Sequence, residues 1–216
     1  LIALGLRDDA LLEARGYAFS PNAAEQAQGK LALSRWYALQ GKPSKAILVL
    51  EGDYKRHVEE GQPFNYPDAA LAYVFTLGYA DHVFRAAQEF GIDPYLMFAL
   101  IREESRFNPG AYSYAAANGL TQIIPSTGRK IAQWLSIRPY STNRLLEPAL
   151  NVRMGTYYLS KRLREFNGEK VLALAAYNGG AHNVNKWLKE FGYDDPDEFV
   201  VHIPFFQTRY YVKSVL

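Results

Sequence analysis

No cysteine occurs in this chain of 216 residues. This absence excludes disulfide bonds, thiolate zinc sites and cysteine nucleophiles. Long hydrophobic runs are also missing, because no apolar stretch approaches the roughly 18 residues that a membrane-spanning helix needs. Neither sign of charge dominates, since the formal net charge is only +2. The charge balance therefore gives no reason to expect nucleic acid or an anionic membrane as a partner.

The first residues lack the features of a secretory signal peptide. The chain opens at Leu1 without a methionine, and no basic region precedes the apolar residues that follow. We therefore expect the sequence to be a fragment or a processed product from which the targeting segment is absent.

Helical periodicity is abundant, and it predicts a mainly α protein. Apolar residues recur at helical spacing through most of the chain, whereas Phe199–Ile203 is the one stretch that suggests a strand. Residues 59–67 are rich in proline and glycine, as expected for a loop or linker. We therefore expect a first helical segment over residues 1–75 and a second domain over residues 76–216.

The most informative stretch runs from Gly91 to Pro109 and has the pattern of one short helix. Asp93 is a suitable N-cap, Pro94 fits the first helical position, and Pro109 disfavours helical angles at the residue before it. At about 100° per residue, several apolar residues share one broad face: Leu96, Met97, Leu100, Ile101 and Phe107. Glu104 falls inside this apolar face.

The predicted position of Glu104 removes its carboxyl group from water and places it near the negative end of the helix dipole. Both effects raise the pKa of a carboxyl group, which makes it usable as a general acid near neutral pH. The alternative is a structural role, in which Glu104 takes a helix-end hydrogen bond or a salt bridge. Glu103 lies toward the edge of the face, three residues before Arg106, where an ordinary surface ion pair is expected.

The residues after Glu104 form a set of ordered motifs that resembles a known family. Residues 102–109 are similar to the glutamate-serine motif of soluble-type lytic transglycosylases, and residues 119–127 to that family's Gly-Leu-Met-Gln segment. Three further signatures follow in the family's order, at residues 151–155, 176–180 and 203–212. The resemblance covers about residues 79–216.

The resemblance implies a fold and a reaction. Residues 76–216 are expected to form a lysozyme-like helical domain, and residues 1–75 the end of the superhelical scaffold that precedes it in larger members. The family cleaves the cell-wall glycan between N-acetylmuramic acid and N-acetylglucosamine, leaving a 1,6-anhydro end instead of adding water. Glu104 would protonate the glycosidic oxygen and then take the proton of the muramic 6-hydroxyl as that group attacks C1.

A single acidic residue must serve both steps, because Glu147, Glu165 and Glu169 have the contexts of solvated helix ends or loops. The substrate's own acetamido group is therefore expected to stabilise the positive C1. Tyr177 and Asn178 would position that group. The remaining residues expected to contact the substrate are Ser105, Thr121, Gln122, Gln207 and Tyr211.

The chain departs from the usual motifs at three positions. Thr121 stands where methionine is common, Ala116 replaces a usual glycine, and Gln207 stands where the closing motif commonly has glutamate. If that glutamate assists charge stabilisation or a proton relay, Gln207 weakens the assistance or alters its pH dependence. Two alternatives remain open for the function: a lysozyme-type hydrolase on the same fold, and a glycan-binding or scaffold protein with a weakened site.

The expected partner is the glycan strand of peptidoglycan, with no nucleic acid, no cofactor and no metal. The N-terminal helices are a candidate contact for other cell-wall proteins. The resemblance places the protein in the periplasm or cell envelope of a bacterium.

Overall fold

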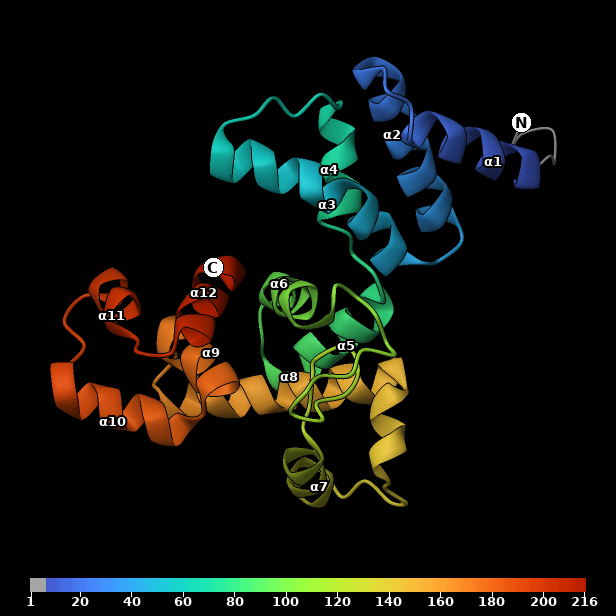
Figure 1. Ribbon diagram of the computed structural model, residues 1–216. Coiled ribbons are helices and arrows are strands. Elements are labelled where there is room, and N and C mark those ends of the chain that lie inside the picture. Colours follow the sequence, from blue (N-terminus) through green and yellow to red (C-terminus); the bar gives the residue numbers. More distant parts are fainter. Residues whose placement is uncertain (1–6) are drawn as a thin grey trace. The chain divides into compact units, whose positions relative to one another are not determined.

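The computed structural model describes residues 7–216, which form two compact units of helices (Figure 1). The first unit reaches Gly78 and includes Arg106–Asn108, and the second comprises Tyr79–Ser105 and Pro109–Leu216. The predicted mainly α fold is confirmed: the described residues contain no strand, only isolated bridges from Asn118 to Tyr112 and Ile123. None of the helices between residues 7 and 216 is both long and apolar enough to cross a lipid bilayer.

From residue 7 onward, the first unit contains four α-helices and one short 3-10 helix. They are α1 (Arg7–Ala18), α2 (Ala23–Leu39), α3 (Pro43–Glu60), η2 (Asp68–Ala70) and α4 (Leu71–Val74). Asn22 caps α2 by accepting hydrogen bonds from the backbone amides of residues 24 and 25. The buried Ser34 hydroxyl of α2 donates to the carbonyl of Ala46 in α3 across 2.7 Å. Helices α1, α2 and α3 therefore pack as consecutive neighbours in this unit.

Residues 106–108 belong to the first unit, although they directly follow the helix that carries Glu104. Arg106 and Phe107 both have positive φ angles, of 48° and 58°, which residues other than glycine seldom adopt. The Arg106 guanidinium donates to the carboxylate of the buried Glu51 across 2.6 and 2.8 Å. Phe107 is only 1 % exposed. Burial and this ion pair hold the unusual backbone in place.

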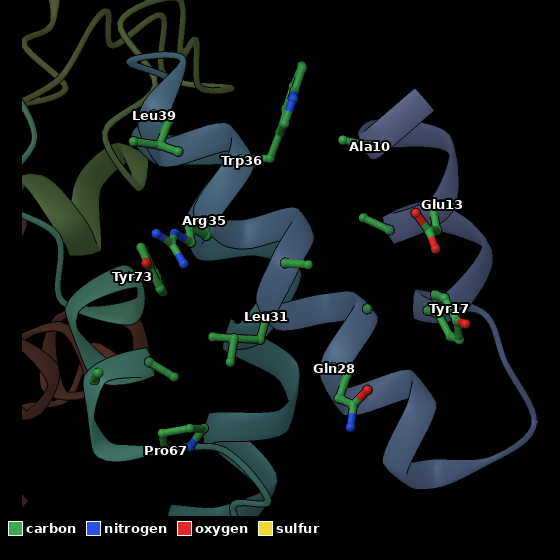
Figure 2. Close-up of a pocket in the computed structure, with 15 residues that line it drawn as sticks. Ala10, Glu13, Tyr17, Gln28, Leu31, Arg35, Trp36, Leu39, Pro67 and Tyr73 are labelled. Atoms are coloured by element: carbon green, nitrogen blue, oxygen red, sulfur yellow. The ribbon is translucent and has the colours of Figure 1, made fainter. Parts of the chain in front are cut away.

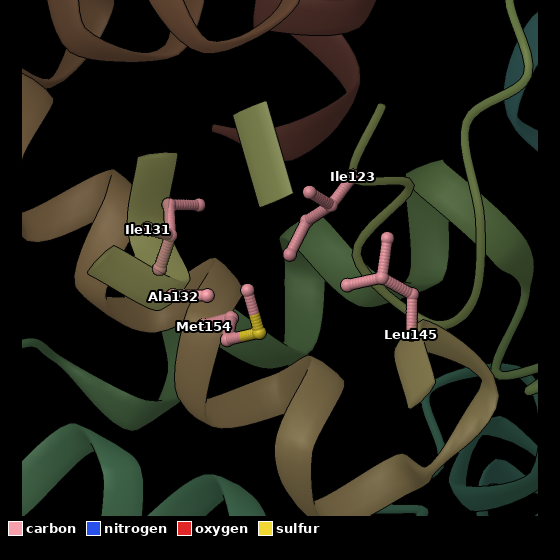
Figure 3. Packing of buried hydrophobic residues seen from close by; sticks show 5 residues of the cluster. All are labelled: Ile123, Ile131, Ala132, Leu145 and Met154. Atoms are coloured by element: carbon pink, nitrogen blue, oxygen red, sulfur yellow. The ribbon is translucent and has the colours of Figure 1, made fainter. Parts of the chain in front are cut away.

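The second unit contains nine further helical elements. They are α5 (Ala80–Phe90), α6 (Pro94–Ser105), α7 (Pro125–Trp134), η3 (Thr142–Leu146), α8 (Pro148–Glu165), α9 (Lys170–Gly179), α10 (Ala181–Phe191), α11 (Pro196–His202) and α12 (Phe206–Val215). Helices α7, η3 and α8 enclose a cluster of buried apolar side chains (Figure 3). Its members are Ile123, Ile131, Ala132, Leu145 and Met154.

Helix α9 is the buried centre of the second unit. The run from Val171 to Ala176 is buried on every face, and the helix packs against α8, α10 and α12. A helix that is apolar all round is stable in water only when other elements cover all of its faces. Because α9 is fixed by three helices, the polar residues at its C-terminal end are held in a defined place.

One local expectation from the sequence is wrong. Phe199–Ile203 does not form a strand, since Pro196–His202 is α11, which begins at the Asp195 cap. Helix α7 begins in a similar way, with Pro125 in its first turn and Ile124 as the N-cap. In both cases a proline at the first helical position sets the start of the helix.

Candidate active site

A cleft of about 550 Å³ in the second unit brings most of the predicted site residues together. Its walls come from the C-terminal end of α6, the loop before α7 and its first turn, the middle of α8, the C-terminal end of α9 and the first turns of α12. The predicted residues that line it are Glu104, Gln122, Tyr177, Asn178, Gln207 and Tyr211. Segments more than 100 residues apart in the sequence therefore contribute to one site.

The carboxyl group of Glu104 is enclosed by protein at the wall of this cleft. Burial raises its pKa from 4.5 to about 8; the neighbouring Tyr211 hydroxyl offsets part of the rise, and the negative charge of Glu103 adds to it. Glu104 is therefore mostly protonated at neutral pH, the state that a general acid requires. This environment agrees with the one predicted from the apolar face of the helix.

Two buried tyrosine hydroxyls lie near Glu104. Burial and the adjacent carboxyl of Glu104 raise the pKa values of Tyr177 and Tyr211 well above 10. The Tyr211 hydroxyl has no hydrogen-bond partner of standard geometry among the described residues, although it is close enough to influence Glu104. Both phenols thus stay protonated at neutral pH, and the Tyr211 hydroxyl is a donor still available to a ligand oxygen.

Ser105 and Thr121 lie behind the wall of the cleft. The Ser105 hydroxyl donates to the carbonyl of Leu120 across 2.8 Å, which ties the end of α6 to the following turn. The Thr121 side chain is fully buried, and its hydroxyl and backbone amide both donate to the Asn151 side-chain oxygen at 2.8 Å. Neither residue lines the cleft, so their contact with substrate stays a prediction, and what they do in the structure is to hold the turn.

Asn151 is the buried centre that holds this turn. Its side-chain amide donates to the carbonyls of Asn118 and Leu145 at 2.9 and 2.8 Å, while its oxygen accepts the two bonds from Thr121. Gly119 has a φ of 77°, and a Cβ there would lie 2.2 Å from the Leu145 carbonyl. The small residues of this segment therefore permit a close backbone approach.

Hydrogen bonds to nearby groups hold the side-chain amides that line the cleft. The Gln122 side-chain nitrogen donates to the carbonyls of Gly119 and Ala111 at 2.8 and 3.2 Å. The Asn178 side-chain oxygen accepts from the buried Thr208 hydroxyl at 2.8 Å, so its amide nitrogen is directed elsewhere. Gln207 is exposed on the cleft surface at the start of α12.

The other candidate carboxylates lie outside the cleft. Glu147 pairs with Arg144, Glu165 pairs with Arg162, and Glu169 accepts from the Tyr193 hydroxyl. Glu103, by contrast, lines the cleft beside Glu104. Across residues 7–216, no group of three or more His, Asp or Glu side chains is arranged to hold a metal ion.

The expected ion pair between Glu103 and Arg106 is wrong. Helix α6 ends at Ser105, and the positive φ of Arg106 turns its side chain toward Glu51. The i,i+3 spacing brings side chains together only where the backbone stays helical. Glu103 therefore keeps its place on the cleft without this partner.

Sequence reasoning did not find several lining residues. They include Glu103, Ser113, Thr127, Tyr158, Gly180 and Tyr210. Tyr158 packs edge-on against Tyr177 with ring centroids 5.2 Å apart. Its helical spacing on α8 indicates a core position, and no local signal distinguishes a core tyrosine from one at the rim of a cleft.

A larger pocket of about 860 Å³ lies in the first unit, between α1, α2 and the η2–α4 segment (Figure 2). Apolar and aromatic side chains such as Leu31, Trp36 and Tyr73 line it, together with Glu13 and Arg35. It contains none of the predicted site residues, and the enclosed carboxyl group of Glu104 lies in the second unit. The candidate active site is therefore the smaller cleft.

Comparison with known proteins places this cleft in a family. The family model described as "Transglycosylase SLT domain" matches residues 81–200. A putative soluble lytic murein transglycosylase of Haemophilus influenzae is 37 % identical over 139 residues, which are 64 % of this chain and 23 % of that protein. The chain thus spans less than a quarter of this relative's length.

Two solved structures extend the likeness to the fold. The 70-kDa soluble lytic transglycosylase SLT70 of Escherichia coli has a TM-score of 0.78 at 29 % identity, covering 100 % of this chain and 32 % of that chain. A complex of the 70-kDa soluble lytic transglycosylase with bulgecin A has a TM-score of 0.77 at 30 % identity, covering 90 % and 29 %. The predicted lysozyme-like helical fold is confirmed by this match.

Proposed function

Because this chain belongs to the transglycosylase SLT domain family, we propose that it is the catalytic part of a peptidoglycan lytic transglycosylase. Its reaction is cleavage of the β-1,4 bond between N-acetylmuramic acid and N-acetylglucosamine without water, giving a 1,6-anhydro end. The observation that carries this proposal is the enclosed carboxyl group of Glu104, whose pKa of about 8 keeps it protonated in a cleft of 550 Å³.

In the first step, the Glu104 carboxyl donates its proton to the glycosidic oxygen as the bond from C1 to that oxygen breaks. The electron pair of the bond stays on the leaving oxygen, and positive charge develops at C1. Glu104 is left as a carboxylate in surroundings that disfavour the charge. It is therefore a strong base for the second step, in which it takes the proton of the 6-hydroxyl while that oxygen bonds to C1.

A carboxylate that stabilises C1 is not needed if the substrate's acetamido oxygen does so. Tyr177 and Asn178 stand side by side at the end of α9, on the wall that also holds Glu104. Since Thr208 occupies the Asn178 oxygen, the Asn178 amide nitrogen is the donor directed at a ligand. We assign these two residues to the acetamido group, and Gln122, Gln207 and Tyr211 to other polar groups of the sugars.

The proposal extends to the setting of the enzyme. Its substrate is the glycan strand of peptidoglycan, which places the protein in the periplasm or cell envelope. We assign residues 1–75 to a scaffold that precedes the catalytic domain and gives other cell-wall proteins a surface to bind. These assignments rest on the family.

Mass spectrometry of muropeptides tests the reaction. Purified peptidoglycan is digested with the protein, and the masses of the muropeptide products are measured. A 1,6-anhydro end supports the proposal. A reducing end, about one water heavier, would instead show a lysozyme-type hydrolase. Intact peptidoglycan that stays tightly bound to the unmutated protein would show a glycan-binding protein without turnover.

The Glu104→Gln variant tests the assignment of the acid. We expect it to lose product formation while it keeps its fold and its binding of bulgecin A, the ligand in the related complex. Bulgecin binding shows that the cleft is still formed. Product formation by a folded Glu104→Gln variant would contradict the role of Glu104.

A further inference from the structure

We propose that Glu103 is a second functional carboxylate of this cleft: a fixed negative charge that holds its neighbour Glu104 in the acidic form. This inference rests on the proposed function, because it assigns Glu103 a task in the same reaction. Glu103 does not react with the sugar itself. It acts through Glu104, because its negative charge favours the protonated form of that neighbour.

The two side chains share the cleft. Both line it as consecutive residues of α6, with side chains about 100° apart around the helix. Both side chains are half-buried, and burial of the carboxyl group raises the pKa of Glu104 to about 8. Glu103 contributes a negative charge that acts on Glu104. The pair therefore combines one neutral acid and one charged group.

No cation on the cleft wall compensates the charge of Glu103. Among the described residues that line the cleft, there is no lysine, arginine or histidine. Arg106, the cation that helical spacing would pair with Glu103, is bound to Glu51. An uncompensated charge acts more strongly on a neighbour when the space between them is poor in water.

The remaining groups that face Glu104 are uncharged phenols. Tyr177 approaches it from α9 and Tyr211 from α12, and both stay protonated at neutral pH. The charge of Glu103 reaches Glu104 and also Tyr211. Burial is the largest cause of the high pKa of Glu104, and Glu103 adds to it. Glu103 therefore raises the pKa of Glu104 further than burial alone does.

The consequence is a loss of activity that depends on pH. A general acid works only while protonated, so the rate falls as the pH rises through the pKa of Glu104. Without the charge of Glu103 this fall moves to lower pH. If the midpoint moves by about one unit, the protonated fraction at pH 8 drops by about fivefold, but at pH 6 it hardly changes.

The test compares pH–rate profiles for peptidoglycan digestion by the unmutated protein, Glu103→Gln, Glu103→Asp and Glu190→Gln. Glu190 lies on the exposed part of α10 and supplies the matched control, since its substitution removes the same charge outside the cleft. We expect only Glu103→Gln to lose activity selectively above pH 7. Glu103→Asp keeps the charge and should keep a profile close to that of the unmutated protein.

An NMR titration of ¹³C-labelled glutamate carboxyl groups gives a readout that does not need activity. The Glu104 signal, assigned with the Glu104→Gln variant, should titrate at lower pH in Glu103→Gln. An unchanged midpoint, or equal losses in Glu103→Gln and Glu190→Gln, would overturn the inference. Absence of anhydro product from the unmutated protein would instead contradict the proposed function, while the titration would still decide the role of Glu103.

Discussion

The Tyr177 hydroxyl donates to the backbone carbonyl of Thr121 across 2.9 Å and so joins the end of α9 to the turn behind the cleft. These residues are 56 positions apart in the sequence. The bond fixes the phenol ring on the cleft wall, where the ring also packs against Tyr158. One hydrogen bond thus links the buried turn to a side chain that we assign to substrate binding.

Removing this hydroxyl should impair catalysis more than folding. In Tyr177→Phe the ring stays, but the Thr121 carbonyl loses its donor, which costs about 1–2 kcal/mol of the free energy of unfolding. We expect a fall in kcat on peptidoglycan at a melting temperature only a few degrees lower. Equal kcat values for the variant and the unmutated protein would contradict a positioning role for the hydroxyl.

The high pKa of Glu104 predicts how stability changes with pH. The folded protein holds a proton on this group up to about pH 8, whereas the unfolded chain loses it near 4.5. Between these values the folded state binds more protons, so its free energy of unfolding falls by about 1.4 kcal/mol per pH unit from this group as the pH rises. Denaturant titrations of the unmutated protein and Glu104→Gln at pH 5 and pH 8 measure the difference. The variant lacks this contribution, so its stability relative to the unmutated protein should rise toward pH 8.

Replacement of Asn151 should lower the free energy of unfolding more than replacement of most other buried polar residues. Its side chain holds the carbonyls of Asn118 and Leu145 and the Thr121 hydroxyl and amide, and it is fully buried. Asn151→Ala leaves these groups without partners, so we expect a loss of about 3–4 kcal/mol in the free energy of unfolding. Asn143→Ala, at an exposed position of η3, is the matched control and should change it by less than about 0.5 kcal/mol. Similar losses in the two variants would argue against this network.

The ion pair between Glu51 and Arg106 should stabilise the first unit. Glu51 is 8 % exposed and accepts from the Arg106 guanidinium at 2.6 Å. Glu51→Gln removes the charge from a partly buried pair, and we expect it to cost about 1–3 kcal/mol. Glu59→Gln, on the exposed end of the same helix, should cost almost nothing. Urea unfolding of both variants measures the difference, and equal midpoints would show that the pair contributes little.

The helix that carries Glu104 could be predicted well because its signals are local. Asp93 accepts from the amide of Tyr95, Pro94 is the first helical residue, and the apolar face is buried as the periodicity indicates. The place of Glu104 on this face follows from the same pattern, because helical spacing fixes which side chains share a face. By contrast, the strand predicted for Phe199–Ile203 was wrong, because the pattern of apolar residues in so short a run fits both a strand and a helix.

The placement of polar residues behind or on the cleft could not be predicted. Ser105 and Thr121 are next to lining residues in the sequence. Their hydroxyls nevertheless donate hydrogen bonds to the Leu120 carbonyl and the Asn151 side-chain oxygen. Which side chain reaches the cleft depends on the positive φ of Gln122 and the close packing at Gly119. These features depend on contacts with α8, about 30 residues away.

The sequence by itself determined the helices, the family and the place of Glu104 near the end of its helix, because each follows from residues close together in the chain or from the order of motifs. Only the tertiary structure decided that Glu103 faces the cleft, because the other walls of the cleft come from segments far along the chain, among them α9 and α12. It also decided which tyrosines surround Glu104, since they come from α9 and α12. Local patterns specify elements, whereas the environment of a carboxyl group is set by all the elements that pack around it.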